Sequence, residues 1–233
     1  MPRLPAHFAS EGIEGRGLPA SAFAMAPEDS NAPFLRIPWA AALLKRTNVI
    51  WFTPASRKRK QSGEDSLFAE ILKTPRTIRS CISFYTRPPP SQTQIDEVHT
   101  IMSTGDGMNG HPDTMHGGIV ASIIDEGMGM LQLANHEREH LAAVSRGQAE
   151  GELPPLGVGT YTAQLNIRYI KPVATPAPVI VTAKYIKRDG RKEWIYAEVK
   201  QRAGLTEDYD GDEVVCATAE GLFIEPRPKK SKL

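Results

Sequence analysis

Cysteines are scarce in this sequence, which excludes two ways of stabilising a fold. Of its 233 residues only two are cysteines, Cys81 and Cys216. Both lie in stretches with strand composition, where a free cysteine packs as a small buried hydrophobic residue. Two isolated cysteines suggest neither a disulfide framework nor a metal site, so we expect neither.

The sequence also lacks long apolar runs and an excess of charge. No stretch approaches the ~18 apolar residues of a transmembrane helix, so no membrane span is expected. The amino-terminal region has prolines and charges without a continuous apolar core, which is not the pattern of a signal peptide. The formal net charge of +1 gives no reason to expect a nucleic acid or an anionic membrane as partner.

What the sequence does contain is enough apolar material for one domain with an extension: hydrophobic residues make up 40% of the chain. Residues 1–33 are rich in Pro, Ala, Gly and Ser and are expected to be loosely ordered. Residues 34–52 are more apolar. A short helix is expected after Pro38, and Trp39 and Trp51 indicate that this part docks on the rest.

The next segments give weaker signals. The basic run at residues 56–60 has two interpretations, a nuclear signal or anion patch and a solvated linker, and we favour the linker. A short helix is expected at residues 66–72. Residues 76–87 have strand composition and are predicted to be the first strand. Residues 91–104 predict a helix, because apolar residues recur there at helical spacing, namely Ile95, Val98, Ile101 and Met102.

Residues 111–130, HPDTMHGGIVASIIDEGMGM, are the stretch around which the chain is organised. Helical spacing of its apolar residues predicts a long helix with one buried face. Those residues are Ile119, Val120, Ile123, Ile124, Met128 and Leu131. The helix is expected from about Met115 to Asn135, and residues 137–145 can extend it.

Two features of this helix suggest a site. Gly117 and Gly118 open it and leave its first N–H groups unobstructed, and such groups bind developing negative charge. Asp125 lies off the buried face among small residues, where a ligand or another backbone can approach closely. Glu126 follows it, but adjacent helix positions point about 100° apart, so the two acids are not expected to act as a pair.

From residue 160 the pattern is that of an antiparallel sheet. Residues 160–170 alternate strictly between apolar and polar, which places Thr162 and Arg168 on the polar face. Further strands are expected at 179–187, 192–201 and 213–225, with a hairpin turn at Asp189-Gly190. One long helix followed by a meander of strands is an α+β arrangement in which the sheet wraps the helix.

The motif HGGIVASIIDEGMG and the stretch LNIRYIKP at residues 165–172 resemble hot-dog fold thioesterases of the PaaI-like and fungal acyl-CoA thioesterase type. The resemblance covers about residues 76–224, and the spacing from His116 to Asp125 fits the family. It implies an α+β hot-dog fold, an antiparallel sheet wrapped around one central helix. The expected division is an amino-terminal extension (1–75), a hot-dog domain (76–226) and an exposed tail (227–233).

This resemblance gives the candidate site a chemistry. Thioester hydrolysis needs an activated water or a nucleophile, and a donor for the oxyanion. Asp125 can serve as general base or as carboxylate nucleophile. The Gly117 N–H, at the positive end of the helix, can bind the thioester oxygen. By resemblance, Thr162 matches a Ser or Thr that helps to position the water.

Six further residues are candidates for substrate contacts: Asn109, His111, His116, Gly118, Arg168 and Lys171. His116 is expected to shape the loop, with a role as a structural cap equally open. Some relatives carry a substrate-contacting Asn in the loop before it, but the matching position here is Gly110, so a neighbour can have taken the role. The basic residues can meet the phosphates of coenzyme A or simply be solvated, as can Lys187, Arg188 and Arg191.

The sequence and the resemblance together predict an acyl-CoA thioesterase that uses no metal or redox cofactor. Coenzyme A enters only as part of the fatty-acyl or related thioester substrate. The alternative within the fold is an enoyl-CoA hydratase or dehydratase, although the motif does not clearly supply the paired His and acid of that chemistry. The alternative from another class is a non-catalytic acyl-CoA-binding protein.

The expected site also requires two copies of the chain. Gly117 and Asp125 are eight residues apart, about 12 Å along one helix. An oxyanion donor must lie ~3 Å from the thioester oxygen, so one straight helix cannot bring both groups to the same carbonyl. Two antiparallel helices across a two-fold axis can, which predicts a homodimer or a dimer of dimers.

The sequence finishes with Ser231, Lys232 and Leu233, the tripeptide read by the peroxisomal import receptor. Pro226 and Pro228 precede it and favour an extended, accessible tail. We therefore expect this receptor as a partner and the peroxisome as location. The alternative is a chance tripeptide on a solvated basic end.

Overall fold

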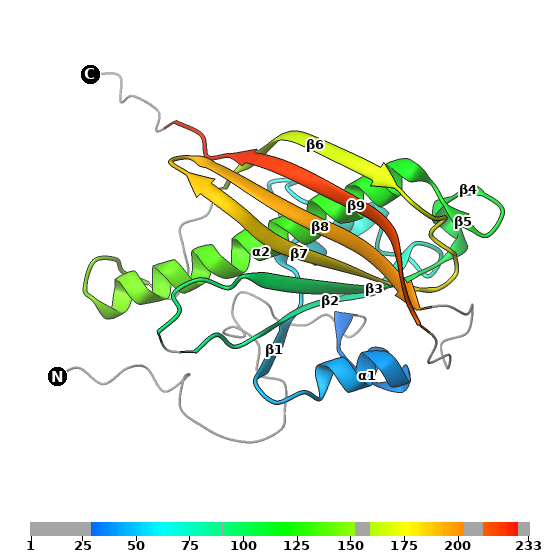
Figure 1. The fold of residues 1–233 in the computed structure, drawn as a ribbon, viewed down its shortest axis with the longest axis horizontal. Coiled ribbons are helices and arrows are strands. Elements are labelled where there is room, and N and C mark those ends of the chain that lie inside the picture. Colours follow the sequence, from blue (N-terminus) through cyan, green and yellow to red (C-terminus); the bar gives the residue numbers. More distant parts are fainter. Residues whose placement is uncertain (1–28, 90, 152–158, 203–211, 228–233) are drawn as a thin grey trace.

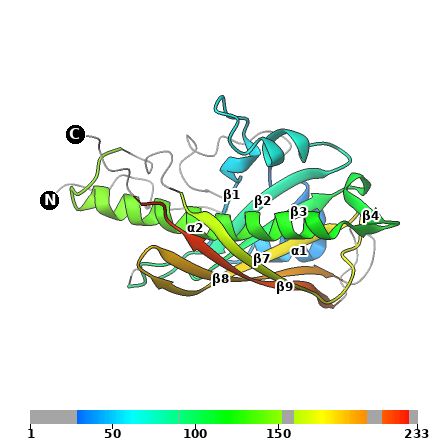
Figure 2. The same ribbon diagram turned by 90° about the horizontal axis from the view of Figure 1, so that it is seen from above.

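The computed structural model describes residues 29–89, 91–151, 159–202 and 212–227. Its main feature is a seven-stranded antiparallel sheet of order β1-β2-β3-β7-β8-β9-β6, which wraps one long helix, α2 (Gly117–Ser145) (Figures 1 and 2). This arrangement confirms the expected α+β hot-dog fold.

The large sheet contains β1 (Val49–Phe52), β2 (Ile78–Thr86), β3 (Glu97–Thr104), β6 (Tyr161–Tyr169), β7 (Pro178–Asp189), β8 (Lys192–Arg202) and β9 (Glu213–Ile224). A two-stranded sheet of β4 (Asn109–His111) and β5 (Thr114–Met115) precedes α2. The predicted hairpin joins β7 to β8, where Gly190 has a φ of 55° and suits the left-handed turn position.

Helix α2 is continuous over the predicted helix and its possible extension. Its buried face, including Ile123, Ile124 and Leu131, packs on the sheet as the apolar spacing predicted. Gly127 permits the close approach, because a Cβ there would lie 2.6 Å from a methyl of Val181 on β7. The helix is therefore held tightly at the residues next to Asp125.

The helix predicted for residues 91–104 is wrong: this segment contains β3. The strand pairs with β2 on one side and β7 on the other, and most of its residues are buried on both faces. Apolar residues on both faces of a central strand imitate helical spacing over a few positions. The periodicity at Val98, Ile101 and Met102 has that origin.

Residues 29–75, here called the N-terminal segment, dock on the sheet as the two tryptophans indicated. Its helical pieces are η3 (Phe34–Arg36), α1 (Pro38–Leu44), η4 (Ala55–Arg57) and η5 (Leu67–Ile71), the last a π-helical turn. Phe34, Trp39 and Trp51 form a second core with residues of β2, β3 and β7. The prediction that residues 76–87 are the first strand is wrong, because β1 precedes them and pairs with β2.

The interpretation of the basic run as a solvated linker is wrong for Ser56 and Arg57. Arg57 is only 1% exposed and Ser56 only 4%, so both are buried, whereas the side chain of Arg59 is 80% exposed. The charge of Arg57 is balanced by Asp29, whose side chain is buried as well. A basic run indicates a solvated surface only when nothing in the fold supplies acceptors, and here the fold does.

Some of the other expectations are confirmed, and others are not tested by the described residues. Cys81 and Cys216 are buried free thiols, as predicted. Within the described residues, no helix is both long and apolar enough to cross a membrane. The tripeptide Ser231–Leu233 and residues 1–28 lie outside the described residues. The peroxisomal location and the division of the chain at residues 75 and 226 therefore stay predictions.

Candidate active site

The start of α2 is capped by His116. This residue has extended backbone angles, φ −60° and ψ 135°, and its Nδ1 accepts a hydrogen bond of 3.0 Å from the Gly118 N–H. The imidazole therefore fills the role that Ser or Asp usually fills at a helix N-terminus. This geometry supports the structural interpretation of His116, and it makes the Gly118 N–H unavailable to a ligand.

The Gly117 N–H is the donor that remains. It has no acceptor among the described residues, and it lies in the first turn of α2, where the helix dipole favours negative charge. The Tyr169 hydroxyl donates to the Gly117 carbonyl at 2.9 Å, and the Tyr169 ring lies 3.6 Å from where a Gly117 Cβ would be. Tyr169 thus holds the Gly117 carbonyl, in the peptide that follows the one carrying the candidate oxyanion donor.

Asp125 and Thr162 meet directly. The Thr162 hydroxyl, on β6, donates to Asp125 Oδ1 at 2.8 Å. Partial burial raises the pKa of Asp125, and the Thr162 hydrogen bond acts in the opposite direction because it favours the ionised form. A carboxylate that is partly desolvated and oriented by a hydroxyl is suited to take a proton from water or to attack a carbonyl.

A β-bulge in β6 creates this contact. Thr162 pairs with Phe223, and the next paired residue, Gln164, pairs with Leu222, so Ala163 is an extra residue. The bulge reverses the alternation and turns Thr162 to the helix side, away from the side of Arg168. The predicted strict alternation is therefore wrong at the site, where bulges often re-aim a side chain.

The second acid of the helix points elsewhere. Glu126 Oε1 accepts a hydrogen bond from the Ser56 hydroxyl of η4, across 70 residues of sequence. Removal from water raises the pKa of Glu126 to about 7, and the Ser56 hydrogen bond opposes that shift. The expectation that Asp125 and Glu126 do not form a catalytic pair is consistent with these separate partners.

The loop before the helix lies beside its start. Asn109 pairs with Met115 across the β4–β5 ladder, and its Oδ1 accepts a hydrogen bond from the Thr175 hydroxyl. A Cβ at Gly110 would lie 3.0 Å from the His116 Cα, so a larger residue does not fit there without a shift. His111 is exposed. These residues lie near the oxyanion end of α2, and Asn109 already has a protein partner.

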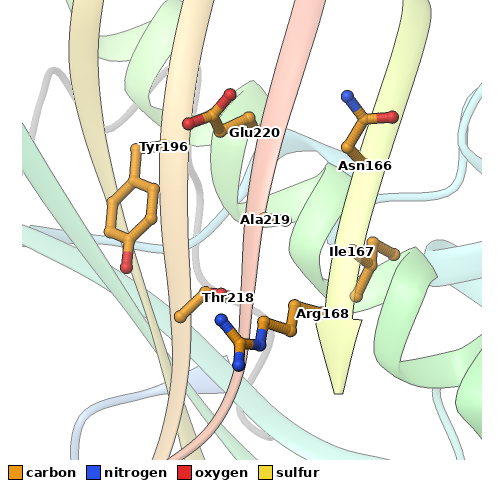
Figure 3. A pocket seen from close by; sticks show the side chains of 7 residues that line it. All are labelled: Asn166, Ile167, Arg168, Tyr196, Thr218, Ala219 and Glu220. Carbon is orange, nitrogen blue, oxygen red and sulfur yellow. The ribbon is translucent and has the colours of Figure 1, made fainter. Parts of the chain in front are cut away.

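Arg168 lies on the opposite face of the sheet from Asp125. It lines a shallow depression of about 270 Å³ with Asn166, Tyr196, Thr218 and Glu220 (Figure 3). Lys171 is exposed just beyond β6. Neither basic residue is brought to Asp125 within one chain, so a contact with substrate phosphates stays a prediction.

The structure thus gathers the predicted residues into three groups: the helix start, the Asp125–Thr162 pair and the outer face of β6. Sequence reasoning missed Tyr169 and Ser56. The alternation in β6 placed Tyr169 on the same face as Ile167, which was a usable signal. Ser56 gave no local signal, because its partner Glu126 is distant in sequence. Within the described residues, no cluster of three or more His, Cys, Asp or Glu is placed to hold a metal ion.

A family model matches the segment that contains the candidate site. Residues 113–204 match the family model described as the thioesterase superfamily. This segment contains Gly117, Asp125 and Thr162, so the predicted resemblance is confirmed where the candidate site lies. A thioesterase-type function is supported at this level.

The chain is also similar to individual proteins. The chain is 23% identical over 188 residues to "Verlamelin biosynthesis protein B" of Lecanicillium sp., covering 70% of this chain and 74% of the relative. A solved thioesterase superfamily protein shares 26% identity, with coverage of 55% and 51% and a TM-score of 0.35, so this chain spans about half of it. A Bacillus halodurans protein solved with CoA shares 22% identity, with coverage of 57% and 70% and a TM-score of 0.38.

Proposed function

We propose that the protein is an acyl-CoA thioesterase that hydrolyses a fatty-acyl or related acyl-CoA to the free acid and coenzyme A. The hydrogen bond from Thr162 to Asp125 is the observation that carries this proposal. It joins two residues of the family-matched segment, and the proposed hydrolysis uses both of them to handle water. The unused Gly117 N–H at the helix start adds a donor for the oxyanion.

The proposed reaction uses Asp125 as general base or as nucleophile. As a base, its carboxylate accepts a proton from water while the water oxygen bonds to the thioester carbonyl carbon. The carbonyl oxygen becomes an oxyanion, which the Gly117 N–H stabilises. When the C–S bond breaks, the proton passes to the departing sulfur, and the products are a carboxylic acid and the coenzyme A thiol. As a nucleophile, the Asp125 carboxylate bonds to the carbonyl carbon and the C–S bond breaks, so that coenzyme A leaves as a thiolate and takes a proton from water. A water molecule then hydrolyses the mixed anhydride to the carboxylic acid and the free Asp125 carboxyl.

The experiment is a thiol-release assay over short, medium and long acyl-CoAs. We expect Asp125→Asn to lower kcat at least ~10²-fold with little change in fold, because the general base or nucleophile is lost. Glu139→Gln is a matched control, an exposed acid further along α2. If Asp125→Asn kept more than about a tenth of the wild-type activity, Asp125 would not be the reacting group.

The same assay decides between the alternatives. Addition of water to an enoyl-CoA without thiol release would favour the hydratase. Binding of acyl-CoA without any turnover would favour a non-catalytic binding protein. Neither alternative requires Asp125 and Thr162 to lie in contact, whereas thioester hydrolysis makes use of that contact.

We further propose a peroxisomal location, with Ser231, Lys232 and Leu233 as the address and the import receptor as partner. The support is the sequence alone, because these residues lie outside the described part of the chain. A fluorescent protein fused at the amino terminus should give punctate signal that overlaps a peroxisomal marker. Deletion of the tripeptide should make that signal diffuse, and an unchanged pattern would contradict the proposal.

A further inference from the structure

Two adjacent acids of α2 are held by elements from opposite ends of the sheet. Asp125 receives its hydrogen bond from β6, the last strand in the sheet order. Glu126 receives its hydrogen bond from η4, which follows β1, the first strand in that order. In Figure 2 the cyan segment that contains η4 and η5 lies on the opposite side of α2 from β8 and β9. Hydrogen bonds to these two acids therefore hold the helix from two sides within the same turn.

Ser56 is held in place independently of Glu126 by its neighbour Arg57. The Arg57 guanidinium bonds Asp29 through Nε and Nη2, at 3.1 and 3.0 Å. Its other N–H groups donate to the carbonyls of Phe68, Leu72 and Ile78 at 2.9 to 3.2 Å. All five N–H donors of an arginine are thus used. Arg57 is buried and all its hydrogen-bond donors have acceptors, so its backbone and that of the adjoining Ser56 are fixed. The Ser56 hydroxyl therefore reaches α2 with little loss of conformational entropy.

The surroundings of Glu126 contain charges of both signs. Arg57 and Asp65 act on it from the N-terminal segment, and Asp125 acts from α2. Asp65 is itself paired with Lys60 at 2.5 Å, which reduces its effect. Cys81, a buried thiol on β2, lies within electrostatic reach of Glu126. No cation is hydrogen-bonded to Glu126 among the described residues. The orientation of its carboxyl group therefore depends on the hydrogen bond from the Ser56 hydroxyl.

We propose that Ser56 and Glu126 are positioning residues for Asp125, which hold the second carboxyl of α2 against the N-terminal segment. Within the part of the chain that the structure describes, Asp125 is then the only carboxylate hydrogen-bonded to Thr162. The kinetic part of this inference rests on the proposed thioesterase function. The N-terminal segment lies outside the family-matched residues 113–204. It nevertheless contributes a residue, Ser56, to the support of the site.

Keeping the Glu126 carboxyl away from Asp125 has an electrostatic consequence. A second carboxylate beside Asp125 would raise the pKa of Asp125 by repulsion and would oppose the charge of an oxyanion. Burial raises the pKa of Glu126 to about 7, so below that pH Glu126 is mainly neutral. As the pH rises above 7, Glu126 gains charge, and we expect the rate of the wild type to fall.

The test uses variants that separate charge from hydrogen bonding. Glu126→Gln keeps an oxygen acceptor for Ser56 but cannot ionise, so the fall in kcat above pH 7 should disappear, with kcat at pH 6 lowered at most about threefold. Ser56→Ala removes the donor, and we expect kcat to fall about tenfold with KM within about twofold. Ser56→Thr keeps the hydroxyl and should restore most of kcat. Ser145→Ala, an exposed serine at the end of α2, is the control.

A second readout needs no substrate. In carbon-13-labelled protein, the Asp125 carboxyl signal of the wild type should show an additional inflection near pH 7 from Glu126, and Glu126→Gln should abolish it. Unchanged kinetics in Ser56→Ala together with an unchanged Asp125 titration in Glu126→Gln would overturn the proposal. If the wild type releases no thiol from any acyl-CoA, the proposed function fails, and the titration alone decides the positioning role.

Discussion

At the scale of single residues, one extra amino acid in β6 creates the contact on which the proposed chemistry of α2 depends. Without the bulge at Ala163, Thr162 would face away from the helix, and Asp125 would lack its hydrogen-bond donor. The donor matters because it counteracts the burial that raises the pKa of Asp125. In the proposed reaction the general base must be ionised at working pH, so we expect Thr162 to extend the range of activity toward acidic pH.

Replacement of Thr162 by valine tests this role. Valine keeps the shape and removes the hydroxyl, so the pKa of Asp125 should rise. Since activity requires the ionised form, the acidic limb of the pH–rate profile should move to higher pH, and kcat should fall about tenfold or more. Thr162→Ser, which keeps the hydroxyl, should behave nearly as the wild type. A limb that stays in place, or moves to lower pH, would show that the contact does not serve catalysis.

Residues at short sequence range were predictable, and those joined by tertiary contacts were not. The spacing from His116 to Asp125 lies within one helix, so the sequence identifies both. Thr162 was matched through the resemblance, but its orientation was predicted wrongly, because alternation cannot reveal a bulge. Ser56 and Arg57 lie in a basic run whose burial depends on Asp29 and on distant carbonyls. No local pattern contains that information.

At the scale of elements, the N-terminal segment is fastened to the sheet by a buried ionic cluster. Asp29 bonds Arg57 and, at 2.8 Å, Lys73, and it accepts a hydrogen bond of 3.1 Å from the Cys81 N–H of β2. Two charges in the interior are favourable only while each keeps its partners. The cluster therefore makes the docking of this segment specific to one position along β2.

The variant Arg57→Met tests whether this ionic cluster stabilises the docked N-terminal segment. We expect the free energy of unfolding to fall by ~3–5 kcal/mol, because Asp29 and three carbonyls lose their donor in the interior. Arg59→Met is the matched control from the same basic run. The Arg59 side chain is 80% exposed and forms an ion pair with Glu70 at 3.4 Å. It should change stability by less than about 0.5 kcal/mol. Urea denaturation of both variants makes the comparison, and equal effects would refute a special role for Arg57.

Elements with one buried face were predictable from the sequence, and the central strand was not. Helix α2 and the β7–β8 hairpin follow from local spacing and turn chemistry. Strand β3 is buried on both faces by its neighbours and by the two cores, so its apolar positions carry no period of two. Only the completed sheet distinguishes such a segment from a short helix.

At the scale of the whole molecule, β6 is the longer of the two edge strands of the large sheet. It ends the sheet with nine residues, whereas β1 at the other end has four. Tyr161 and Tyr169 on it are 71% and 55% exposed. A long exposed edge favours pairing with another strand. A Cβ at Gly129, one turn beyond Asp125, would meet nothing within 4 Å, so the helix is open on this flank too.

We propose a second copy of the chain as the partner for this edge and flank. Pairing of two β6 strands about a two-fold axis would set the two α2 helices antiparallel. Gly117 of one chain would then approach Asp125 of the other, whereas within one helix the two residues are held about 12 Å apart. An isologous dimer built in this way has two equal sites, each with residues from both chains.

Subunit mixing tests the shared site. Asp125→Asn removes the carboxylate, and Gly117→Pro removes the candidate oxyanion N–H. Proline is tolerated here because Gly117 is the first helical residue and His116 already has the extended backbone that precedes proline. Gly117→Ala, which keeps the N–H and whose Cβ would be in ordinary contact with Tyr169 at 3.6 Å, is the control. Each inactivating variant should be inactive alone.

Mixed heterodimers should regain about half of the wild-type activity, because one of their two sites holds an intact Gly117 and an intact Asp125. The other site carries both lesions and contributes nothing. If each site were built within one chain, every site in the heterodimer would carry one lesion, and no activity would return. A folded heterodimer without activity, or full activity in a verified monomer, would therefore exclude the shared site, whereas recovery that rises with the heterodimer fraction has no explanation within a single chain.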